Sequence, residues 1–328
     1  MRLGLFFYSF PVLISLILAG CNRVEEVVPV FFHGSTLIEA TRTSAVIETG
    51  VSFEGSFPVT ACGVCWGTTE NPTINDPHTA DGEGSGAFTS TIPGLDPNTL
   101  YYLRPYATSK AGTGYGDQIY IKTMAGEVTD IDGNVYSTII SGNMEWMAEN
   151  LKTSRLSDGT AIPLVTDPLE WSSLTTPAYC LPGNSSAEYG ALFNWYAVKT
   201  GELCPDGWHT ASLNNWYSLV YPFDNNLQAD MESKTAGCDL SKPGIRQFSG
   251  CMSVASNKSG ISAIAGSFRF RNGDFSNDTR SSRFWLPEDP YNSYFTFCMY
   301  VSCGCSSKQT SLTTGNKGDG YSVRCVKN

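Results

Sequence analysis

Charged residues are scarce in this chain of 328 residues, at 16%, against roughly 25% in average soluble proteins. Basic residues are the scarcer sign, because 21 Lys and Arg stand against 31 Asp and Glu, a net charge of −10. Since binding to polyanions relies on basic side chains, we expect no nucleic-acid partner. The chain has only three His, which gives imidazole-based metal centres few ligands.

Long apolar runs are absent after the first twenty residues, so no second segment has the length needed to span a bilayer. Gly, Ser, Thr, Asn and aromatic residues fill the places that charged residues usually hold. This composition favours short strands and many turns over long helices. A Gly-x-Ser-x-Gly nucleophile motif is also absent.

The N-terminus carries the most specific local signal. Arg2 precedes an apolar run over residues 3–18, and Cys21 directly follows Ala19 and Gly20. This order is typical of a secretory signal, and it resembles the lipobox of bacterial lipoproteins. The resemblance implies removal of residues 1–20 and acylation of Cys21 by diacylglycerol and a further chain such as palmitate. A plain signal peptide with a chance cysteine is the alternative.

Residues 21–29 are expected to form an acylated tether. Glu25 and Glu26 lie just after the cysteine. An acidic pair at this place resembles the surface-export signal of lipoproteins from Bacteroidetes-like bacteria, although a solvated linker would also carry acids. We therefore expect a lipid-anchored protein of the outer membrane, exposed at the cell surface.

Eleven cysteines occur in total, and ten remain after Cys21. An even number in an exported chain permits disulfides without requiring them. Cys62 and Cys65 have the spacing of a zinc or redox pair. However, they lie in a strand-like run, where residues three apart point to opposite faces. We expect no metal and no cofactor, and the role of this pair stays open.

Residues 30–124 are expected to form an all-β, immunoglobulin-like sandwich of about seven strands. Strand-like alternation occurs at residues 46–51, 101–107 and 119–123, with Gly and Pro between the runs. The Gly-Leu-x-Pro-x-Thr-x-Tyr pattern at residues 94–101 resembles a fibronectin type III-like repeat of bacterial surface proteins. Trp66 is then a packing residue, and such modules usually serve as spacers or binding platforms.

Residues 125–328 are expected to form a second module. Residues 213–220 have helical spacing with Ser212 as cap, and residues 189–198 are a second candidate helix. Several segments together resemble the Fibrobacter succinogenes major paralogous domain, at residues 130–136, 146–152, 189–198, 203–209 and 320–326. That family is similar in pattern to formylglycine-generating-enzyme-like and C-type-lectin-like domains. The resemblance implies an α+β, C-type-lectin-like domain with long loops.

An enzyme of the formylglycine-generating type is not expected. Those enzymes use a cysteine pair shortly after a Gly-Gly-Ser-Phe turn, and residues 265–271 stand at the comparable place here. The next cysteine is Cys298, so the thiols are missing from the matching positions. His209 follows Pro-Asp-Gly as in the family pattern, and we expect a structural role for it.

A calcium lectin is not expected either. The triplets Glu-Pro-Asn, Gln-Pro-Asp and Trp-Asn-Asp, which coordinate calcium in sugar-binding C-type lectins, do not occur. Asp130, Asp132 and Asn134 alternate as in a calcium loop, but Gly133 lies inside the triplet. An Asp-Gly-Asn turn is the better interpretation.

The loop over residues 287–292 is the candidate ligand contact. Aromatic rings beside acids can stack on sugars or anchor a protein, which points to Trp285, Glu288, Asp289 and Tyr291. The alternative is that Phe284 and Trp285 supply one buried strand face.

The lectin-like resemblance also implies that the first and last strands of the domain are neighbours. Cys204, shortly before Trp208, would then reach Cys325 in the last strand and could form a disulfide with it. Cys180 is the rival partner for either thiol, and a reduced state is a further alternative.

These features favour a surface-anchored, non-catalytic binding or adhesion protein for glycans or cell-surface proteins, with the membrane as its other partner. The alternative is a carbohydrate-active hydrolase with an unrecognised carboxylate pair. Such an enzyme needs two carboxyl groups about 5–10 Å apart.

Overall fold

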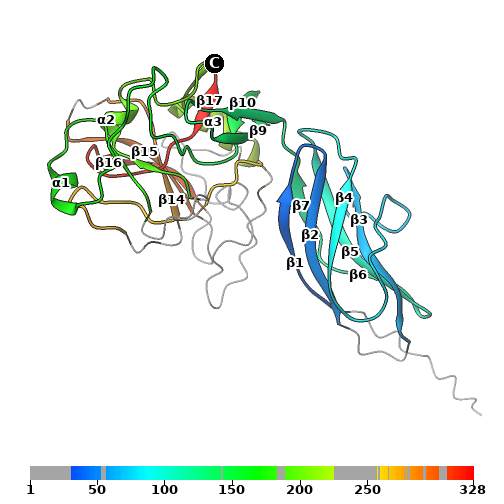
Figure 1. Ribbon diagram of the computed structural model, residues 1–328. Coiled ribbons are helices and arrows are strands. Elements are labelled where there is room, and N and C mark those ends of the chain that lie inside the picture. The colour runs from blue at the N-terminus through cyan, green and yellow to red at the C-terminus, as the bar shows by residue number, and fades with distance from the viewer. Residues whose placement is uncertain are drawn as a thin grey trace, which may run out of the picture.

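The structure is a computed structural model. It describes residues 31–52, 57–141, 143–182, 189–224, 257, 259–264, 266–276, 278, 281–290, 293–302 and 309–328. Two β-rich lobes lie end to end, with β1 to β7 in one lobe and the later elements in the other (Figure 1).

The first lobe contains seven strands: β1 (Phe31–Ala40), β2 (Ser44–Ser52), β3 (Val59–Gly67), β4 (Gly86–Pro93), β5 (Leu100–Ser109), β6 (Gly112–Tyr115) and β7 (Ile119–Lys122). One sheet has the order β1-β2-β4. The other has the order β3-β5-β6, and β7 pairs with the first half of β5. The three sequence runs with strand-like alternation therefore belong to β2, β5 and β7, as predicted.

The core of this lobe lies between its two sheets. Ile47 and Ile92 come from the first sheet, and Val64, Leu103 and Ile121 come from the second. All five side chains are buried. Alternation with period two places these residues on the inner faces, and the prediction of a β-sandwich is confirmed.

The two lobes are joined by hydrogen bonds as well as by the chain. The Asn98 side chain accepts a hydrogen bond from the amide of Ile140, with 3.0 Å between Oδ1 and N. Lys122 Nζ donates to the carbonyl of Ile140 over 2.6 Å, and burial lowers the pKa of this amine. These contacts attach a turn and the last strand of the sandwich to β9 (Val135–Ser141) of the second lobe.

The second lobe has many short elements: β8 (Gly126–Thr129), β9 (Val135–Ser141), β10 (Met144–Met147), α1 (Pro168–Ser173), β11 (Tyr179–Cys180), β12 (Leu192–Phe193), α2 (Trp195–Val198), β13 (Trp208–Thr210), α3 (Leu213–Val220), the 3-10 helix η1 (Tyr221–Phe223), β14 (Ser281–Trp285), β15 (Phe295–Ser302), β16 (Thr310–Asn316) and β17 (Cys325–Lys327). One sheet has the order β13-β17-β10-β9-β8, and another the order β14-β15-β16. β11 pairs with β12.

The terminal strand β17 lies inside the five-stranded sheet. It pairs with β13 through His209↔Val326 and with β10 through Trp146↔Val326. Both pairings are antiparallel. The last strand of the chain is thus packed in the lobe rather than left at an edge.

The helix at residues 213–220 is confirmed, with a capping box between Ser212 and Asn215. Its Trp216 packs edge to face on Trp146 of β10, with 5.4 Å between ring centroids. The candidate helix at residues 189–198 is shorter than predicted, because Leu192–Phe193 pairs as a strand and only Trp195–Val198 is helical. None of the helices in the described ranges is long and apolar enough to cross a membrane.

Candidate ligand-binding site

The structure corrects one part of the predicted ligand loop. Trp285 is fully buried in β14. Its Nε1 donates to the carbonyl of Phe193 over 2.7 Å, and its ring lies 4.3 Å from that of Tyr321. Because its indole N–H is hydrogen-bonded inside the core, Trp285 is a packing residue. This is the alternative stated from the sequence, a buried strand face.

The acids of that loop have partners within the protein. Glu288 Oε1 accepts from the amide of Leu213 at the start of α3, over 2.8 Å. Asp289 Oδ2 pairs with Lys317 Nζ at 2.5 Å, and Lys317 also lies over the ring of Trp195. These two acids fasten the loop to α3 and to the turn after β16. Tyr291 lies outside the described residues.

Cys204 and Cys325 are joined by a disulfide, with 5.9 Å between their Cα atoms. Cys62, Cys65 and Cys180 are buried free thiols. Burial raises the pKa of the Cys65 thiol to about 12, with a further contribution from Asp76, so this thiol is protonated at neutral pH. The three predicted N-terminal residues Cys21, Glu25 and Glu26 lie outside the described residues.

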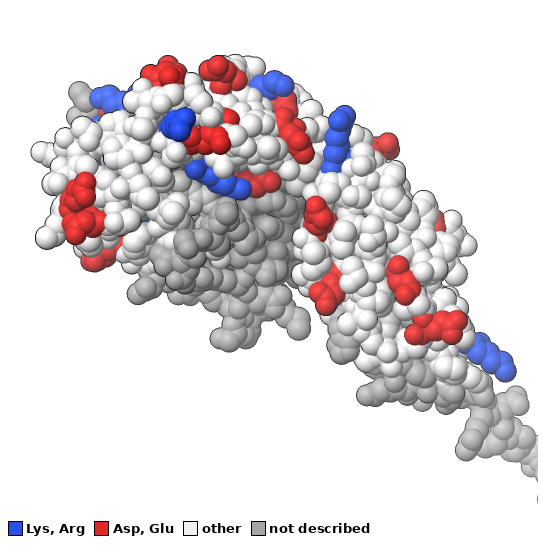
Figure 2. Space-filling model, in the orientation of Figure 1, with Lys and Arg blue, Asp and Glu red and all other residues white. Residues whose placement is uncertain are grey.

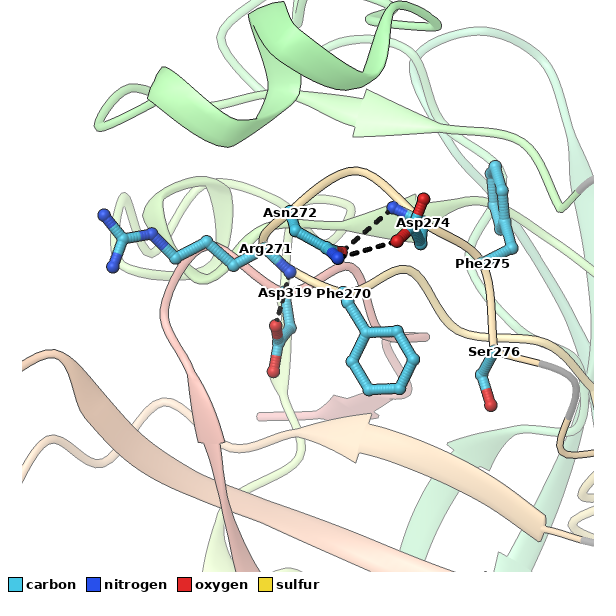
Figure 3. A pocket seen from close by; sticks show the side chains of 7 residues that line it. All are labelled: Phe270, Arg271, Asn272, Asp274, Phe275, Ser276 and Asp319. Carbon is cyan, nitrogen blue, oxygen red and sulfur yellow. Dashed lines mark hydrogen bonds between the residues drawn. The ribbon is translucent and has the colours of Figure 1, made fainter.

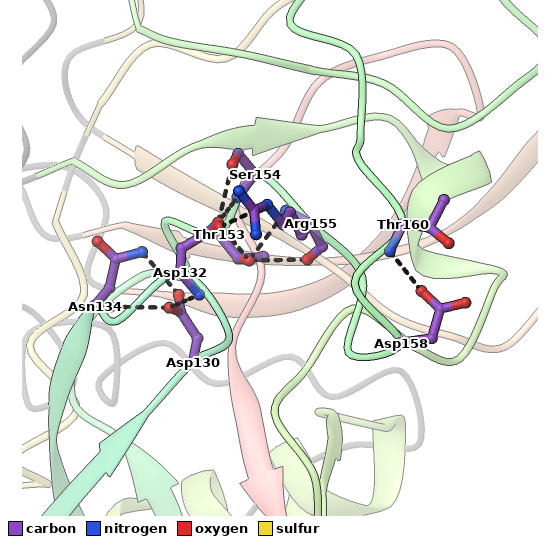
Figure 4. Close-up of polar contacts among 8 residues, drawn as sticks. All are labelled: Asp130, Asp132, Asn134, Thr153, Ser154, Arg155, Asp158 and Thr160. Atoms are coloured by element: carbon purple, nitrogen blue, oxygen red, sulfur yellow. Dashed lines mark hydrogen bonds and ion pairs between the residues drawn. The ribbon is translucent and has the colours of Figure 1, made fainter.

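The alternating triplet Asp130, Asp132 and Asn134 is a turn that its own side chains stabilise (Figure 4). Asp130 accepts from the amides of Asp132 and Asn134 and from the hydroxyl of Tyr136. Gly133 at the turn has a φ of 84°, a value that favours glycine. The carboxylate oxygens therefore already have donors within the chain.

Asp132 connects this turn to the next loop (Figure 4). It accepts hydrogen bonds from Thr153 and Ser154 and pairs with Arg155 at 3.3 Å. Burial opposes its ionisation, but the hydrogen bonds from Ser154 and Thr153 and the charge of Arg155 outweigh burial and lower its pKa. Within the described residues, no group of three or more His, Cys, Asp or Glu side chains is placed to hold a metal ion.

A surface hollow lies at a hairpin over residues 269–276, which we call the 269–276 hairpin. The cavity has a volume of about 840 Å³ and is open to solvent. It is lined by residues 270–272 and 274–276 together with Asp319 (Figure 3). The volume lies within the range of small-molecule sites, roughly 300–1,000 Å³.

Backbone pairing shapes the tip of the hairpin. Phe270 donates its amide to the carbonyl of Asp274 over 2.8 Å, and Gly273 donates to the carbonyl of Phe270 over 2.9 Å. Gly273 has a φ of +89°, and a Cβ atom there would lie 2.4 Å from Cα of Pro168 in α1. Only glycine therefore allows the turn to lie this close to α1.

Arg269 holds the base of the hairpin. The side chain is 1% exposed, and its guanidinium donates to the carbonyls of Val165, Thr166 and Gly273. It is also stacked on the ring of Trp171, with 4.6 Å from Cζ to the ring centroid. All of these contacts form inside the protein, so the cavity wall is held in place before any ligand arrives.

Asp319 holds the opposite side. Oδ1 accepts from the amide of Arg271 over 2.7 Å, and Oδ2 accepts from the amide of Asn316 and the hydroxyl of Tyr321. Burial raises the pKa of this carboxyl, and the hydrogen bonds from Tyr321, Arg271 and Asn316 only partly oppose the effect. The group that positions the hairpin tip thus favours the protonated form more than an ordinary carboxyl does.

This raised pKa gives a measurable pH dependence. Between the ordinary carboxyl pKa and the raised pKa of Asp319, the folded state binds more protons than the unfolded state. The contribution of Asp319 to the free energy of unfolding should therefore decrease as pH rises through this window. The Asp319→Asn variant should lack that contribution. Urea unfolding of both proteins from pH 4 to 7 measures the difference, and parallel pH curves would contradict the prediction.

One exposed ring lines the cavity, and another lies beside the lining residue Arg271. Phe270 is 43% exposed, although it packs edge to face against Phe268. Tyr294 is 73% exposed, and the guanidinium of Arg271 lies 6.0 Å from its ring centroid. Sequence reasoning missed this site, because residues 265–271 were compared only with a catalytic turn. An aromatic residue directly before a polar Arg-Asn-Gly-Asp turn is the signal that the sequence offers.

The second lobe corresponds to a known domain. The sequence model of the Fibrobacter succinogenes major domain matches residues 139–327, which include the candidate site and most of the second lobe. The chain belongs to the Fibrobacter succinogenes major domain family. The resemblance stated from the sequence is thereby confirmed for this family. A comparison with curated proteins finds no match.

Solved structures give weaker likenesses. The sensor domain of the anti-sigma factor RsgI4 of Pseudobacteroides cellulosolvens is 23% identical, with a TM-score of 0.23, and the match covers 30% of this chain and 96% of that one. The sixth fibronectin type III domain of human fibronectin type III domain containing protein 3 is 26% identical, with a TM-score of 0.22 and coverages of 27% and 79%. The assignment of a sandwich in this family member rests on its own strand pairing.

Proposed function

We propose that this family member is a lipid-anchored, non-catalytic binding protein of the outer membrane surface. In this proposal Cys21 carries the lipid, and Glu25 and Glu26 direct export to the outer leaflet. The sandwich over residues 30–124 acts as a spacer, and residues 125–328 hold the ligand site, in a lectin-like arrangement. The last strand β17 lies between β13 and β10, and the first strand β8 lies at the edge of the same sheet, so the lectin-like arrangement rests on the sequence resemblance alone.

The observation that carries a binding role is the cavity at the 269–276 hairpin. It is preformed, open to solvent and lined by both aromatic and polar side chains. Arg269, Gly273 and Asp319 hold its walls without a ligand. A rigid site of this kind loses little conformational entropy on binding, which suits recognition.

A hydrolase is less well supported. The two acids that line the cavity are Asp274 and Asp319. Asp319 already accepts hydrogen bonds from three groups of the protein, and Oδ2 of Asp274 accepts from the side chain of Asn272. A glycosidase instead needs one carboxyl to protonate the leaving group and a second to attack or activate water.

Anchoring is tested by Cys21→Ala. The variant should remain unprocessed or leave the membrane, because it has no thiol to carry the acyl chains that supply the free energy of membrane binding. Membrane fractionation and fatty-acid labelling measure both effects. If the variant stays in the outer membrane with undiminished label, the lipoprotein proposal is wrong.

Surface export is tested separately by replacing Glu25 and Glu26 with Ala. This double variant should keep its lipid and its membrane attachment but lose accessibility to protease added to intact cells. Gln at both positions is the matched control, since it preserves size and polarity while removing charge. Equal shaving of wild type and the Ala variant would contradict the export role.

A further inference from the structure

We propose that the cavity at the 269–276 hairpin binds a neutral saccharide, with a pyranose ring stacked on Phe270 and without a metal ion. This inference rests on the proposed binding function and names the class of ligand. The polar lining, the exposed ring and the charge of the site carry it.

Charge restricts the ligand first. Asp274 and Asp319 both line the cavity, whereas its single cation, Arg271, extends away from the other lining side chains (Figure 3). The exposed carboxylate of Asp274 in the wall repels phosphates and uronic acids, and this repulsion is stronger at a protein surface than in bulk water. The face drawn in Figure 2 shows scattered acids and no cluster of basic side chains among the described residues. Anionic ligands are therefore disfavoured.

A cationic peptide also fits poorly. Asp319 is 8% exposed and already accepts three hydrogen bonds within the protein, which leaves Asp274 as the one exposed acid of the lining. The exposed guanidinium at the rim belongs to Arg271, and it lies over the ring of Tyr294, the most exposed aromatic side chain nearby. A basic side chain approaching that ring would meet a like charge.

The remaining groups suit hydroxyl-rich, uncharged molecules. Phe270 presents part of an aromatic ring, which is held by an edge-to-face contact with Phe268, with 4.9 Å between ring centroids. The apolar C–H face of a pyranose can pack on such a ring. Asn272 and Asp274 are fixed by their mutual hydrogen bond of 2.7 Å. Within the described part of the chain, only one carboxylate oxygen of Asp274 has a partner, which leaves the other to accept from sugar hydroxyls.

The shape of the site points to one or a few residues of a longer chain. A cavity of about 840 Å³ that is open to solvent can enclose part of a saccharide chain while both ends of that chain extend into solvent. Recognition without a cation follows from the donors already bound to Asp319. We therefore expect binding that a chelator does not affect.

The experiment uses the lipidated, full-length protein purified in mild detergent. Native gel electrophoresis through xyloglucan, mixed-linkage β-glucan, galactomannan or arabinoxylan measures binding, with polygalacturonate and heparin as anionic probes. We expect retardation by at least one neutral polysaccharide, unchanged by EDTA. Phe270→Ala should weaken that binding about tenfold or more, since it removes the stacking surface.

Two control variants distinguish loss of the aromatic face of Phe270 from loss of any exposed ring. Phe270→Trp should retain binding because it preserves an aromatic face. Tyr217→Ala removes a ring with the same 43% exposure on α3 and should leave binding unchanged. If no neutral polysaccharide retards the protein, or if Phe270→Ala binds as well as wild type, the saccharide assignment is wrong.

A second arm separates this inference from the proposed function. Immobilised mucin is offered intact, after periodate oxidation of its vicinal diols, and after protease digestion. Phe270-dependent capture that periodate abolishes supports the saccharide assignment. Capture that survives periodate and is lost on proteolysis overturns that assignment while the binding function stands. Capture that does not depend on Phe270 overturns the saccharide site alone, whereas absence of any capture in the mucin and polysaccharide arms alike overturns both.

Discussion

Replacing Arg324 with Met should lower the free energy of unfolding of the second lobe by about 3 to 5 kcal/mol, as expected when a buried, hydrogen-bonded charge is removed. Arg324 is 0% exposed. Its guanidinium donates to the carbonyls of Met147, Ile261 and Ser262 and to the side chain of Asn150. Burial lowers its pKa to about 9, so the group still carries its charge at neutral pH.

The size of the effect comes from the buried oxygen acceptors that lose their hydrogen-bond donor when Arg324 is removed. Met fills the volume of the side chain but has no N–H groups, so the buried oxygens lose their donors. Each unsatisfied buried polar group costs about 1 to 3 kcal/mol. Arg324 also connects the start of β17 to two segments far away in the sequence. Its removal should therefore affect the whole lobe.

Lys327→Met is the matched control. Lys327 ends the strand β17 that begins directly after Arg324, but it is exposed and its ion pair with Glu145, at 2.7 Å, is solvent-accessible. The control should lose less than about 1 kcal/mol. Urea unfolding followed by tryptophan fluorescence measures both variants, because every Trp except Trp66 lies in the second lobe. Equal midpoints for Arg324→Met and wild type would show that the buried guanidinium contributes nothing.

Removing the disulfide is the second large perturbation. Cys204 and Cys325 are 121 positions apart, and a loop of that length is expected to contribute up to about 5 kcal/mol through chain entropy, with measured values often smaller. The double variant Cys204→Ala with Cys325→Ala should therefore unfold at a clearly lower urea concentration. Its β13–β17 pairing, which includes Thr210↔Cys325, should remain at low denaturant.

The pairing itself is tested by peptide mapping without reductant. Protein from the native envelope should yield a Cys204–Cys325 peptide pair that separates on reduction. Cys180, the rival partner, should be recovered as a thiol, because it is a buried free cysteine whose pKa burial raises to about 11. Recovery of Cys204 and Cys325 in separate alkylated peptides, or of either one joined to Cys180, would contradict the pairing.

The sandwich illustrates what local pattern can determine. Alternation at residues 46–51, 101–107 and 119–123 defined strands β2, β5 and β7, because a period of two decides which side chains face a core. The helix over residues 213–220 was equally local, since its cap and capping box lie within four residues. Membership of the family also followed from short ordered segments.

The ligand site shows the limit of such reasoning. Trp285 and Phe270 are both aromatic residues near polar turns, and the sequence pattern favoured the first. Only the structure shows that Trp285 is enclosed by Phe193 and Tyr321, while Phe270 remains at the surface. Burial depends on which segments pack together, and single-residue chemistry does not contain that information.

The sequence by itself determined the strand pattern of the first lobe, the capped helix and the family of the second lobe, because each depends on residues that lie close together in the sequence. Tertiary structure alone decided where the cavity lies and which acids line it. Asp319 reaches the 269–276 hairpin through the pairing Arg269↔Gly320, and Gly273 rests on Pro168 from another segment. These contacts join residues about 50 to 100 positions apart, and they form only when the free energy of packing outweighs the entropy of closing such loops.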